Sequence, residues 1–439
     1  MRVVKGMLVA AACAASTLAA AGDDPELDAL FDIGASAPAS GSGIALGGYA
    51  EFSGAYTTAA KGHWSKLRAR TELSANGNAG GGMKWRVTGR LEADAAQNLE
   101  GDFYPDAVRR DQRTDAVLRE AYLDLPAGDW EFRFGRQQVV WGEMVGFFFA
   151  DVVSARDLRE FLLPEFESLR IPQWAARAEY FGADTHFELL WVPVASYDRI
   201  GKPGADFYPY PAQLVPSGVA VVEKKPDQDG RDGNWGLRAS RLIDGWDLSA
   251  FYYDSRNVEP SLYRVSFAPA YELRHDRIRQ FGGTFSKDMG PFVLKGEVVH
   301  ASGRRFISLD PNAPFGLRKS DTLDYAVGVD VPVGSDWRFN VQYFERLHFN
   351  HADGMLVERN EPGATFQAVH TFGSEFEFEF LAASSLIRRD FMLRPKLTWK
   401  FAPEWRALMG VDYFEGRHTA LFGRFDDSDR VYFEVRRWF

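Results

Sequence analysis

The chain has 439 residues and a formal net charge of −10, and its 35 Phe, 16 Tyr and 12 Trp make it rich in aromatic residues. Its mean hydropathy is only −0.28, and beyond the first residues no apolar run reaches the ~20 residues that a membrane helix needs. The acidic balance argues against nucleic acid as a partner, whereas an aromatic-rich, moderately polar chain suits a membrane β-barrel, in which only alternate residues face lipid.

The amino terminus predicts export from the cytoplasm. Residues 1–21 have the pattern of a signal peptide, with a basic start, an apolar alanine-rich middle and a small-residue cleavage site at 19–21. Residues 22–43 are acidic and then rich in Ala, Ser, Pro and Gly, which predicts a periplasmic N-terminal tail or linker. The single cysteine, Cys13, lies in the signal peptide, so no disulfide and no thiolate metal site are expected in the mature chain.

Residues 44–439 predict an all-β fold, a transmembrane antiparallel up-and-down β-barrel. Short polar turns such as 76–78 alternate along the chain with long connections such as 143–170 and 195–234, as periplasmic turns and outer loops do in outer-membrane barrels. Eighteen strands can be counted, which places both termini on the periplasmic side, and sixteen is the alternative because 185–194 and 275–287 are the least regular. The predicted strands are 44–59, 64–76, 82–95, 114–126, 130–141, 171–181, 185–194, 235–243, 246–255, 275–287, 291–302, 321–333, 337–347, 363–372, 376–384, 388–401, 405–415 and 430–439.

Apolar and polar residues alternate along these strands, which predicts two different faces. Leu393, Leu397, Val411 and Phe433 are expected to face lipid. Strands that follow the tight turns begin with an aromatic residue, as at Trp405, which predicts an aromatic girdle at one membrane interface.

The last strand ends the chain on Phe439 and resembles the closing strand of bacterial outer-membrane barrels. The resemblance implies that Phe439 is an assembly signal and that the barrel assembly machinery is a partner. Arg437 departs from the pattern, because an aromatic or aliphatic residue is more common at its position. An ordinary edge strand of a soluble sheet is the alternative for this segment.

The inward faces of the predicted strands are mostly ionisable, which a wet lumen tolerates because it does not desolvate the charges. They can be cross-strand ion pairs that brace the wall, or fixed charges that select solutes, and the near balance of signs predicts no strong ion preference. The residues predicted to line the lumen or its constriction are Arg68, Arg70, Arg86, Arg90, Arg133, Arg136, Arg177, Glu179, Arg238, Arg338, Arg394, Lys396, Phe147, Phe148, Phe149, Leu158, Phe161 and Leu162.

The connection at 143–170 carries too many apolar residues for a solvated outer loop. We expect it to fold into the lumen, which is too wide in an eighteen-stranded barrel to be filled by its own wall side chains. Ser154 is predicted to be the N-cap of a helix that Pro164 would end or kink. The loop carboxylates are expected to hold it against wall arginines; they are Glu143, Asp151, Asp157, Glu160, Glu165 and Glu167.

Residues 135–174 resemble the DUF1302 family of outer-membrane barrels. The matching motifs are Gly-Arg-Gln, Val and Trp-Gly within 135–142, Asp-Val-Val at 151–153, Leu-Arg-Glu-Phe at 158–161 and Arg-Ile-Pro with a following Trp at 170–174. The resemblance implies an outer-membrane protein considered alongside export systems for hydrophobic molecules. It implies no substrate.

The sequence therefore predicts a channel or transporter of the bacterial outer membrane for small or hydrophobic solutes, surrounded by lipid and lipopolysaccharide. The alternatives are a non-conducting barrel with periplasmic export partners, and a barrel enzyme. No metalloprotease, serine-hydrolase or phosphate-loop motif is present, so no enzyme activity and no cofactor are predicted. The Asp-rich and Gly-rich run at 227–233 lacks calcium-loop spacing and predicts a solvated turn rather than a metal site.

Overall fold

The computed structural model describes residues 43–59, 61–142, 144, 148–210, 214–215, 219–227, 230, 232–266 and 270–439. The predicted signal peptide at 1–21 lies outside these residues, as do residues 22–42 of the predicted tail. Glu143 and Phe147 also lie outside them.

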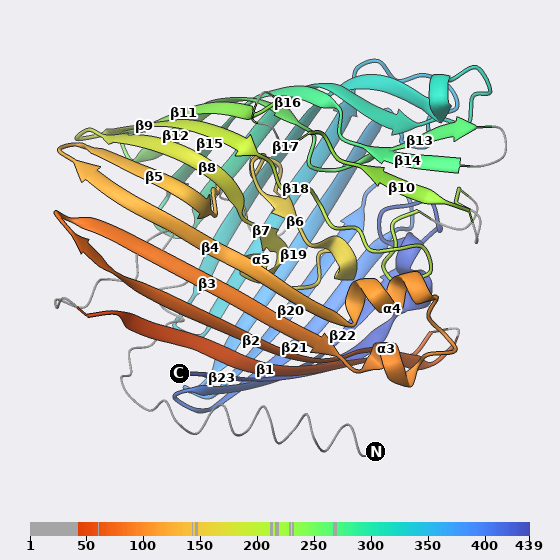
Figure 1. Cartoon of the computed structure of the whole chain (residues 1–439), viewed down its shortest axis with the longest axis horizontal. Helices are drawn as coiled ribbons and strands as arrows, with labels where there is room; N and C mark the ends of the chain where they lie inside the picture. The colour runs from red at the N-terminus through yellow and green to blue at the C-terminus, as the bar shows by residue number, and fades with distance from the viewer. Residues whose placement is uncertain are drawn as a thin grey trace.

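Eighteen antiparallel strands form one closed barrel (Figure 1). Each barrel strand pairs with the barrel strands that precede and follow it in the chain, and the first pairs with the last, so the sheet has no free edge. All eighteen predicted strands are present, so the sixteen-stranded alternative is wrong. The barrel strands are β1 (Ala45–Thr57), β2 (His63–Gly80), β3 (Met83–Asp94), β4 (Thr114–Ala127), β5 (Trp130–Gln137), β8 (Gln173–Phe181), β9 (Thr185–Val194), β11 (Asn234–Ile243), β12 (Trp246–Arg256), β15 (Arg277–Asp288), β16 (Val293–Ile307), β17 (Leu317–Val333), β18 (Trp337–His348), β19 (Asn360–Phe372), β20 (Phe376–Ser385), β21 (Phe391–Ala402), β22 (Trp405–Glu415) and β23 (Arg430–Trp438).

The remaining elements are short and lie in the long connections. Among the described residues, no helix combines the length and the apolar character needed to cross a lipid bilayer. The short elements are α3 (Ala96–Leu99), α4 (Asp106–Gln112), β6 (Ala155–Arg156), η1 (Leu158–Glu160), α5 (Phe166–Leu169), β7 (Arg170–Ile171), β10 (Val221–Lys224), β13 (Ser261–Ser266), β14 (Ala270–Arg274), η2 (Pro314–Gly316) and η3 (Gly423–Ser428).

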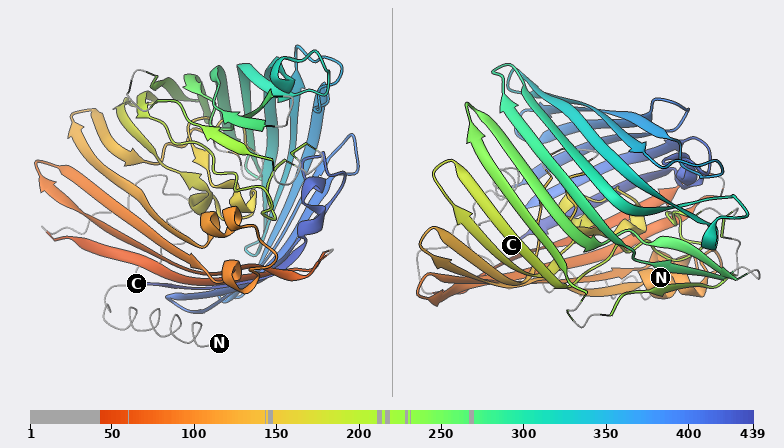
Figure 2. Two further views of the ribbon diagram at one scale, coloured as in Figure 1. Left: turned by 45° about the vertical axis from the view of Figure 1, so that its right-hand side comes forward. Right: turned by 90° about the horizontal axis from the view of Figure 1, so that it is seen from above.

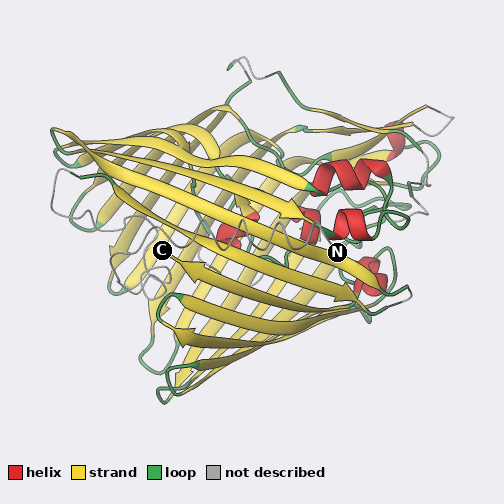
Figure 3. Ribbon diagram, turned by 60° about the horizontal axis from the view of Figure 1, so that its bottom comes forward, coloured by secondary structure: helices red, strands yellow, loops and turns green. Residues whose placement is uncertain are grey.

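The two ends of the barrel differ as the turn chemistry predicts. Tight turns join strands at one end, where Gly334 and Gly373 adopt left-handed φ values of 64° and 62° that favour glycine. Helices α3 and α4 lie at the opposite end, among the long connections (Figures 1 and 3). In barrels of the bacterial outer membrane, the tight turns are usually periplasmic and the long connections face outward from the cell. The end of this barrel that carries the long connections is here called the outer end.

The inner and outer faces of the wall have the predicted chemistry. On the outer face, Val341 and Met409 are 47% and 57% exposed, and Trp399 stacks on Phe376 of the neighbouring strand. On the inner face, Asp412 is fully buried. Large apolar side chains exposed around the whole barrel therefore form the lipid-facing surface.

Strand β5 is shorter than predicted, because it ends at Gln137 rather than at residue 141. The chain leaves the wall there and turns inward, so Trp141 is only 1% exposed. Its ring contacts Phe251 and Tyr253, and its indole Nε1 donates a hydrogen bond of 3.1 Å to Glu188. The apolar residues after Gln137 continue the strand pattern in sequence but pack inside the barrel.

Neighbouring residues of β18 offer a matched test of the register. Val341→Arg is expected to lower the free energy of unfolding by ~2–4 kcal/mol, because it places a charge in the lipid-facing surface near mid-strand. Asn340→Arg places the same charge in the lumen and is expected to cost much less. Unfolding of both variants in lipid or detergent measures the difference. Equal losses would mean that the assigned faces are wrong, since a one-residue slip exchanges them.

Deleting Phe439 is expected to impair assembly in cells more than the stability of the folded barrel. The deletion removes two backbone hydrogen bonds of 3.0 Å with Gly48, whereas the β1–β23 pairing from Tyr49 with Trp438 to Thr57 with Arg430 remains. Outer-membrane levels in cells and thermal unfolding of refolded protein measure the two effects. Phe439→Tyr, which keeps the aromatic terminus, is the control, and normal cellular levels of the truncated protein would contradict the prediction.

Candidate functional site

Residues 138–172 are here called the inward loop, and their described parts lie inside the barrel between β5 and β8. Their elements β6, β7 and α5 lie within the ring of strands (Figures 1 and 2), so the prediction that this connection folds into the lumen is confirmed. Apolar burial anchors its first part against the inner wall. One cluster joins Val139, Trp141, Ala150, Val152 and Val153 to inward-facing residues of the wall, which are Ala175, Leu190, Val192, Phe251, Tyr253 and Val299. Each large side chain buried in this way contributes ~1.5–3 kcal/mol.

The loop then reaches the inner faces of β16 to β18. The backbone N–H of Phe149 donates a hydrogen bond to the Glu297 carboxylate, and its ring lies edge-on to Phe344 with a centroid distance of 6.3 Å. Phe148 contacts the ring of Phe166, 5.2 Å away in the same loop. Phe148, Phe149 and Phe166 are therefore half-buried by contacts with the wall and with each other.

A third apolar contact holds the tip of the loop against the opposite part of the wall. Phe161 packs on Phe414 of β22 and on Phe422 and Phe425 of the last outer connection. Its φ of 53° is unusual for a residue with a side chain and costs on the order of 1–3 kcal/mol. The aromatic cluster that this backbone conformation allows offsets that cost.

The strongest polar contact of the loop is Glu160, which meets three wall cations. Its carboxylate lies 2.8 Å from Lys66, 2.8 Å from Arg68 and 3.1 Å from Arg430. Burial by itself would raise the pKa of Glu160, but the three cations outweigh it and hold the pKa well below its usual range. Glu160 is therefore a charged latch between the loop and strands β2 and β23.

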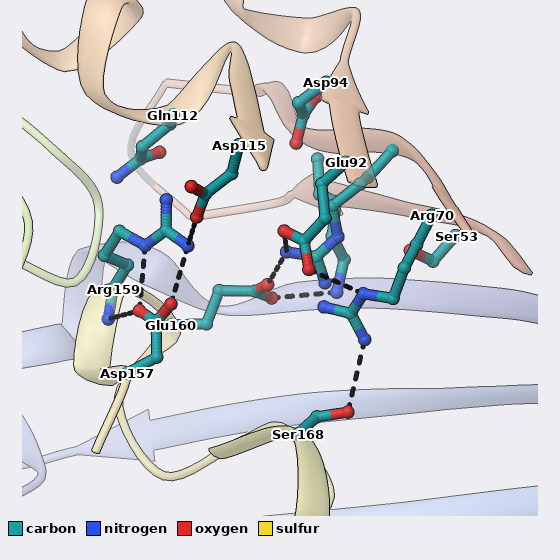
Figure 4. Close-up of polar contacts among 12 residues, drawn as sticks. Ser53, Arg70, Glu92, Asp94, Gln112, Asp115, Asp157, Arg159, Glu160 and Ser168 are labelled. Atoms are coloured by element: carbon teal, nitrogen blue, oxygen red, sulfur yellow. Dashed lines mark hydrogen bonds and ion pairs between the residues drawn. The ribbon is translucent and has the colours of Figure 1, made fainter. Parts of the chain in front are cut away.

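A second group of contacts follows the tip. Glu165 lies 2.8 Å from Arg406 and 3.1 Å from Arg436. Its side chain is 43% exposed, and the two arginines outweigh its partial loss of solvent and hold the pKa of its carboxyl below the usual range. Arg394 donates a hydrogen bond of 2.9 Å to the Leu163 carbonyl. Arg70 donates one of 3.3 Å to Ser168 (Figure 4). Residues 160–168 are therefore bound by basic side chains of β2 and β21 to β23, here called the basic part of the wall.

At Arg159 the charges are exchanged between loop and wall, because here the loop supplies the cation and the wall supplies the carboxylate. This loop arginine donates 3.0 Å to Asp115 of the wall and 2.6 Å to Asp157 of its own loop (Figure 4). Asp157 also caps η1, since its carboxylate accepts from the Arg159 backbone N–H. The predicted N-cap at Ser154 is wrong, because Ser154 instead donates its hydroxyl to the Val139 carbonyl and the residues directly after it form strand β6.

A cavity of about 320 Å³ lies between residues 160–168 of the inward loop and the inner faces of β1, β2 and β18 to β23. Seven basic side chains line it, all from the wall: Lys66, Arg68, Arg70, Arg394, Lys396, Arg430 and Arg436. Six carboxylates also line it: Glu51, Glu379, Asp412 and Glu434 from the wall, and Glu160 and Glu165 from the loop. We take this cavity as the candidate functional site.

The predicted site residues fall into several groups. Arg68, Arg70, Arg394, Lys396 and Leu162 line the cavity. Phe148, Phe149, Leu158 and Phe161 belong to the apolar contacts of the loop. The inward-facing wall residues outside the cavity lining are Arg86, Arg90, Arg133, Arg177, Glu179, Arg238 and Arg338, several of them paired with acids of their own strand or the next, as Arg133 is with Asp124.

Arg136 does not line the lumen. It shares the outward-facing register of β5 with Phe134 and pairs across the ladder with the exposed Trp174. Its guanidinium donates a hydrogen bond of 2.6 Å to the Leu118 carbonyl. Counting outward from Trp130 would have placed it correctly, because the strand alternates without interruption to Gln137.

Sequence reasoning missed Glu51 and Arg430, which line the cavity. Both follow the alternation of their strands, since Arg430 has the parity of the inward-facing Arg436. It also missed the apolar parts of the inner wall. The signal for these was the loss of alternation in stretches such as Leu189 to Val192, where both faces are apolar.

Glu160→Gln tests the latch. Removing the carboxylate leaves Lys66, Arg68 and Arg430 without it, so the free energy of unfolding should fall by ~3–5 kcal/mol and proteolysis of the loop should increase. In the wild type, the stabilisation by Glu160 is complete above the ordinary carboxyl pKa of ~4.3. It declines as the pH falls from there toward the lowered pKa of Glu160, at which the carboxylate is protonated.

Glu131→Gln is the matched control for Glu160→Gln, because Glu131 also lies near an arginine but at 3.5 Å and half-exposed. Its effect should be within ~1 kcal/mol. Equal stability and equal proteolysis of the two variants would show that Glu160 does not hold the loop.

Comparison with curated proteins finds no match for this chain. Among solved structures, similar folds include OmpF of Salmonella typhi in complex with daunomycin, with 10% sequence identity, a TM-score of 0.46, and coverage of 90% of this chain and 97% of that one. OmpT of Vibrio cholerae in its trimer form has 11% sequence identity and a TM-score of 0.44, and the match covers 90% of this chain and 99% of that one. A mutant of Rh. blastica porin has 13% sequence identity and a TM-score of 0.41, and the match covers 90% of this chain and 100% of that one. Similarity at this level carries no functional information.

The family comparison agrees with the motifs of the inward loop. The model of the family described as "Protein of unknown function (DUF1302)" matches residues 6–371. This range includes the inward loop and the barrel strands from β1 to β18, and it reaches into β19. The chain therefore belongs to the DUF1302 family, as the resemblance of residues 135–174 implies.

Proposed function

We propose that this barrel is a channel of the bacterial outer membrane and that the inward loop sets the width of its solute path. The observation that carries the proposal is the cavity of about 320 Å³ between the loop and the basic part of the wall. It lies inside a closed barrel whose outer face is apolar, so a solute within it is shielded from lipid. Its volume is at the lower end of the range for small-molecule sites.

The charges around the cavity suit passage rather than permanent storage of a solute. Polar solutes that leave water need replacement contacts, which fixed charges and hydroxyls on the lumen wall provide. Lys396 and Glu379, 2.7 Å apart, and Arg394 and Asp412, 2.8 Å apart, offer both signs within the cavity lining. Contacts of both signs bind a passing solute weakly at several places, and that allows it to move on.

A non-conducting barrel that serves an envelope export complex is the second candidate. The observation in its favour is that other connections contact each other across the outer end. Asp206 accepts hydrogen bonds from Tyr104 at 2.7 Å and lies 2.8 Å from His63, and Ser428 donates 2.7 Å to the Asp206 carbonyl. Three outer connections therefore converge on one residue, which would restrict access from outside.

Replacing residues 162–166 by Gly-Ser-Gly-Ser-Gly tests the channel. The change removes the apolar side chains after Phe161 and also Glu165, but it keeps Glu160, Phe161, the chain length and the apolar anchor before residue 154. We expect a wild-type barrel that conducts in planar bilayers and a variant with a larger single-channel conductance, because the loop no longer narrows the path.

The same five-residue replacement at 350–354, in the connection between β18 and β19, is the control and should leave conductance unchanged. Exclusion of sized polyethylene glycols would report the width directly. An unchanged conductance of the loop variant would contradict the constriction. A folded wild-type protein that never conducts would contradict the channel and favour the export component.

A further inference from the structure

We infer that the cavity selects small organic anions that carry an apolar body, such as monocarboxylates. This inference rests on the proposed function and names the class of solute for the same site. Three features of the cavity lead to it: an excess of wall cations, arginine donors without partners, and an apolar surface beside them.

The first feature is the distribution of charge between loop and wall. All seven cations of the lining belong to the wall, whereas only four of the six lining carboxylates do. Glu160 and Glu165 of the loop supply the other two, and both lie on wall cations. The wall by itself is therefore basic, and the loop shows that carboxylates bind to it. The overall balance of lumen charges predicted no strong ion preference. Here the lining holds one more cation than carboxylates, and we expect a preference for anions.

The second feature is a surplus of hydrogen-bond donors. An arginine has five N–H donors in a planar fork, and a carboxylate fits two of them at once. The Nε atoms of Arg68 and Arg436 are buried and have no hydrogen-bond partner in the part of the chain that the structure describes. Both arginines line the cavity. The acids around these two arginines therefore leave part of each guanidinium unpaired, and that positive charge beside the cavity favours an anion within it.

The third feature is the apolar surface of the same cavity. Leu162 and Leu163 of the loop face it together with Leu381, Met392 and Leu408 of the wall. Neither a sugar nor an inorganic ion would gain from this surface, whereas an alkyl chain or an aromatic ring would. The anion is expected to place its carboxylate near Arg68 and Arg436 and its apolar body against these side chains. A volume of about 320 Å³ limits it to a small molecule.

The test uses hexanoate as probe, with hexanamide, hexylammonium and acetate as matched compounds. Each is added to the full-length protein in planar bilayers in potassium chloride, and block of the current is measured. Hexanoate should block at a concentration at least about tenfold lower than acetate, because it carries four more methylene groups and burying only two of them changes affinity by about that factor. Hexanamide and hexylammonium should block at higher concentrations than hexanoate. Calorimetry with the same compounds measures binding without requiring conduction.

Two variants locate the site. Arg68→Gln removes one guanidinium group from the cavity lining. Lys66 and Arg430 still pair with Glu160, so the loop stays in place. The variant should weaken hexanoate binding about tenfold and acetate binding similarly. Met392→Gln should weaken the binding of hexanoate but leave the binding of acetate unchanged. Arg133→Gln is the control, because Arg133 is an inward-facing wall arginine paired with Asp124 outside the cavity lining.

The outcomes separate this inference from the proposed function. A conducting barrel in which hexanoate, hexanamide and hexylammonium act equally, or in which Arg133→Gln matches Arg68→Gln, overturns the inference and leaves the channel intact. Equal affinity for acetate and hexanoate overturns the role of the apolar surface. Hexanoate binding by calorimetry without any conduction supports the inference about the site and contradicts the channel.

Discussion

The contact between the Glu160 carboxylate and Lys66, Arg68 and Arg430 is the interaction on which the interior of this barrel depends. Removing a carboxylate and three cations from water costs several kcal/mol for each ion, and only close pairing offsets that cost. Here the distances are 2.8 to 3.1 Å. Without Glu160 the basic part of the wall would lose its main counter-charge, and the tip of the inward loop would lose its fixed position.

The width of the barrel creates the need for this contact. Eighteen strands enclose a lumen that wall side chains cannot fill, so either water or another segment must occupy it. The inward loop does so unevenly. Its first part, around Trp141 and Val153, forms an apolar core with β8, β9, β12 and β16, whereas residues 160–168 lie over the charged wall. One side of the lumen is therefore packed like a protein interior, and the other keeps a polar cavity.

This division explains why wall charges alone do not predict selectivity. Most inward-facing ions, such as Arg90 with Glu72 at 2.7 Å, are paired across neighbouring strands and brace the wall. Around the cavity, the pairing is completed by residues of the loop, so the excess of basic groups becomes visible only when the loop and the wall are considered together. A solute that carries a carboxylate meets the same donors that hold Glu160 and Glu165.

Much of the barrel could be predicted because alternation along a strand is a local property. The faces of Val341, Met409 and Asp412 follow from a period of two residues, and tight polar turns mark where each strand ends. The same rule places Arg430 inside and Arg136 outside. Ser154 could not be judged in this way, because Val139, fifteen residues earlier, accepts its hydroxyl only after the loop has folded back.

The sequence by itself determined the eighteen strands, the lipid-facing surface, the closing strand and the entry of an apolar loop into the lumen, because each of these depends on residues that are close in the chain. Only the tertiary structure decided which loop residue meets which wall residue. Glu160 and Arg430 are 270 residues apart, and they meet because β23 pairs with β1 and brings the end of the chain beside its beginning. Barrel closure therefore creates the cavity, and no pattern within a single strand contains that information.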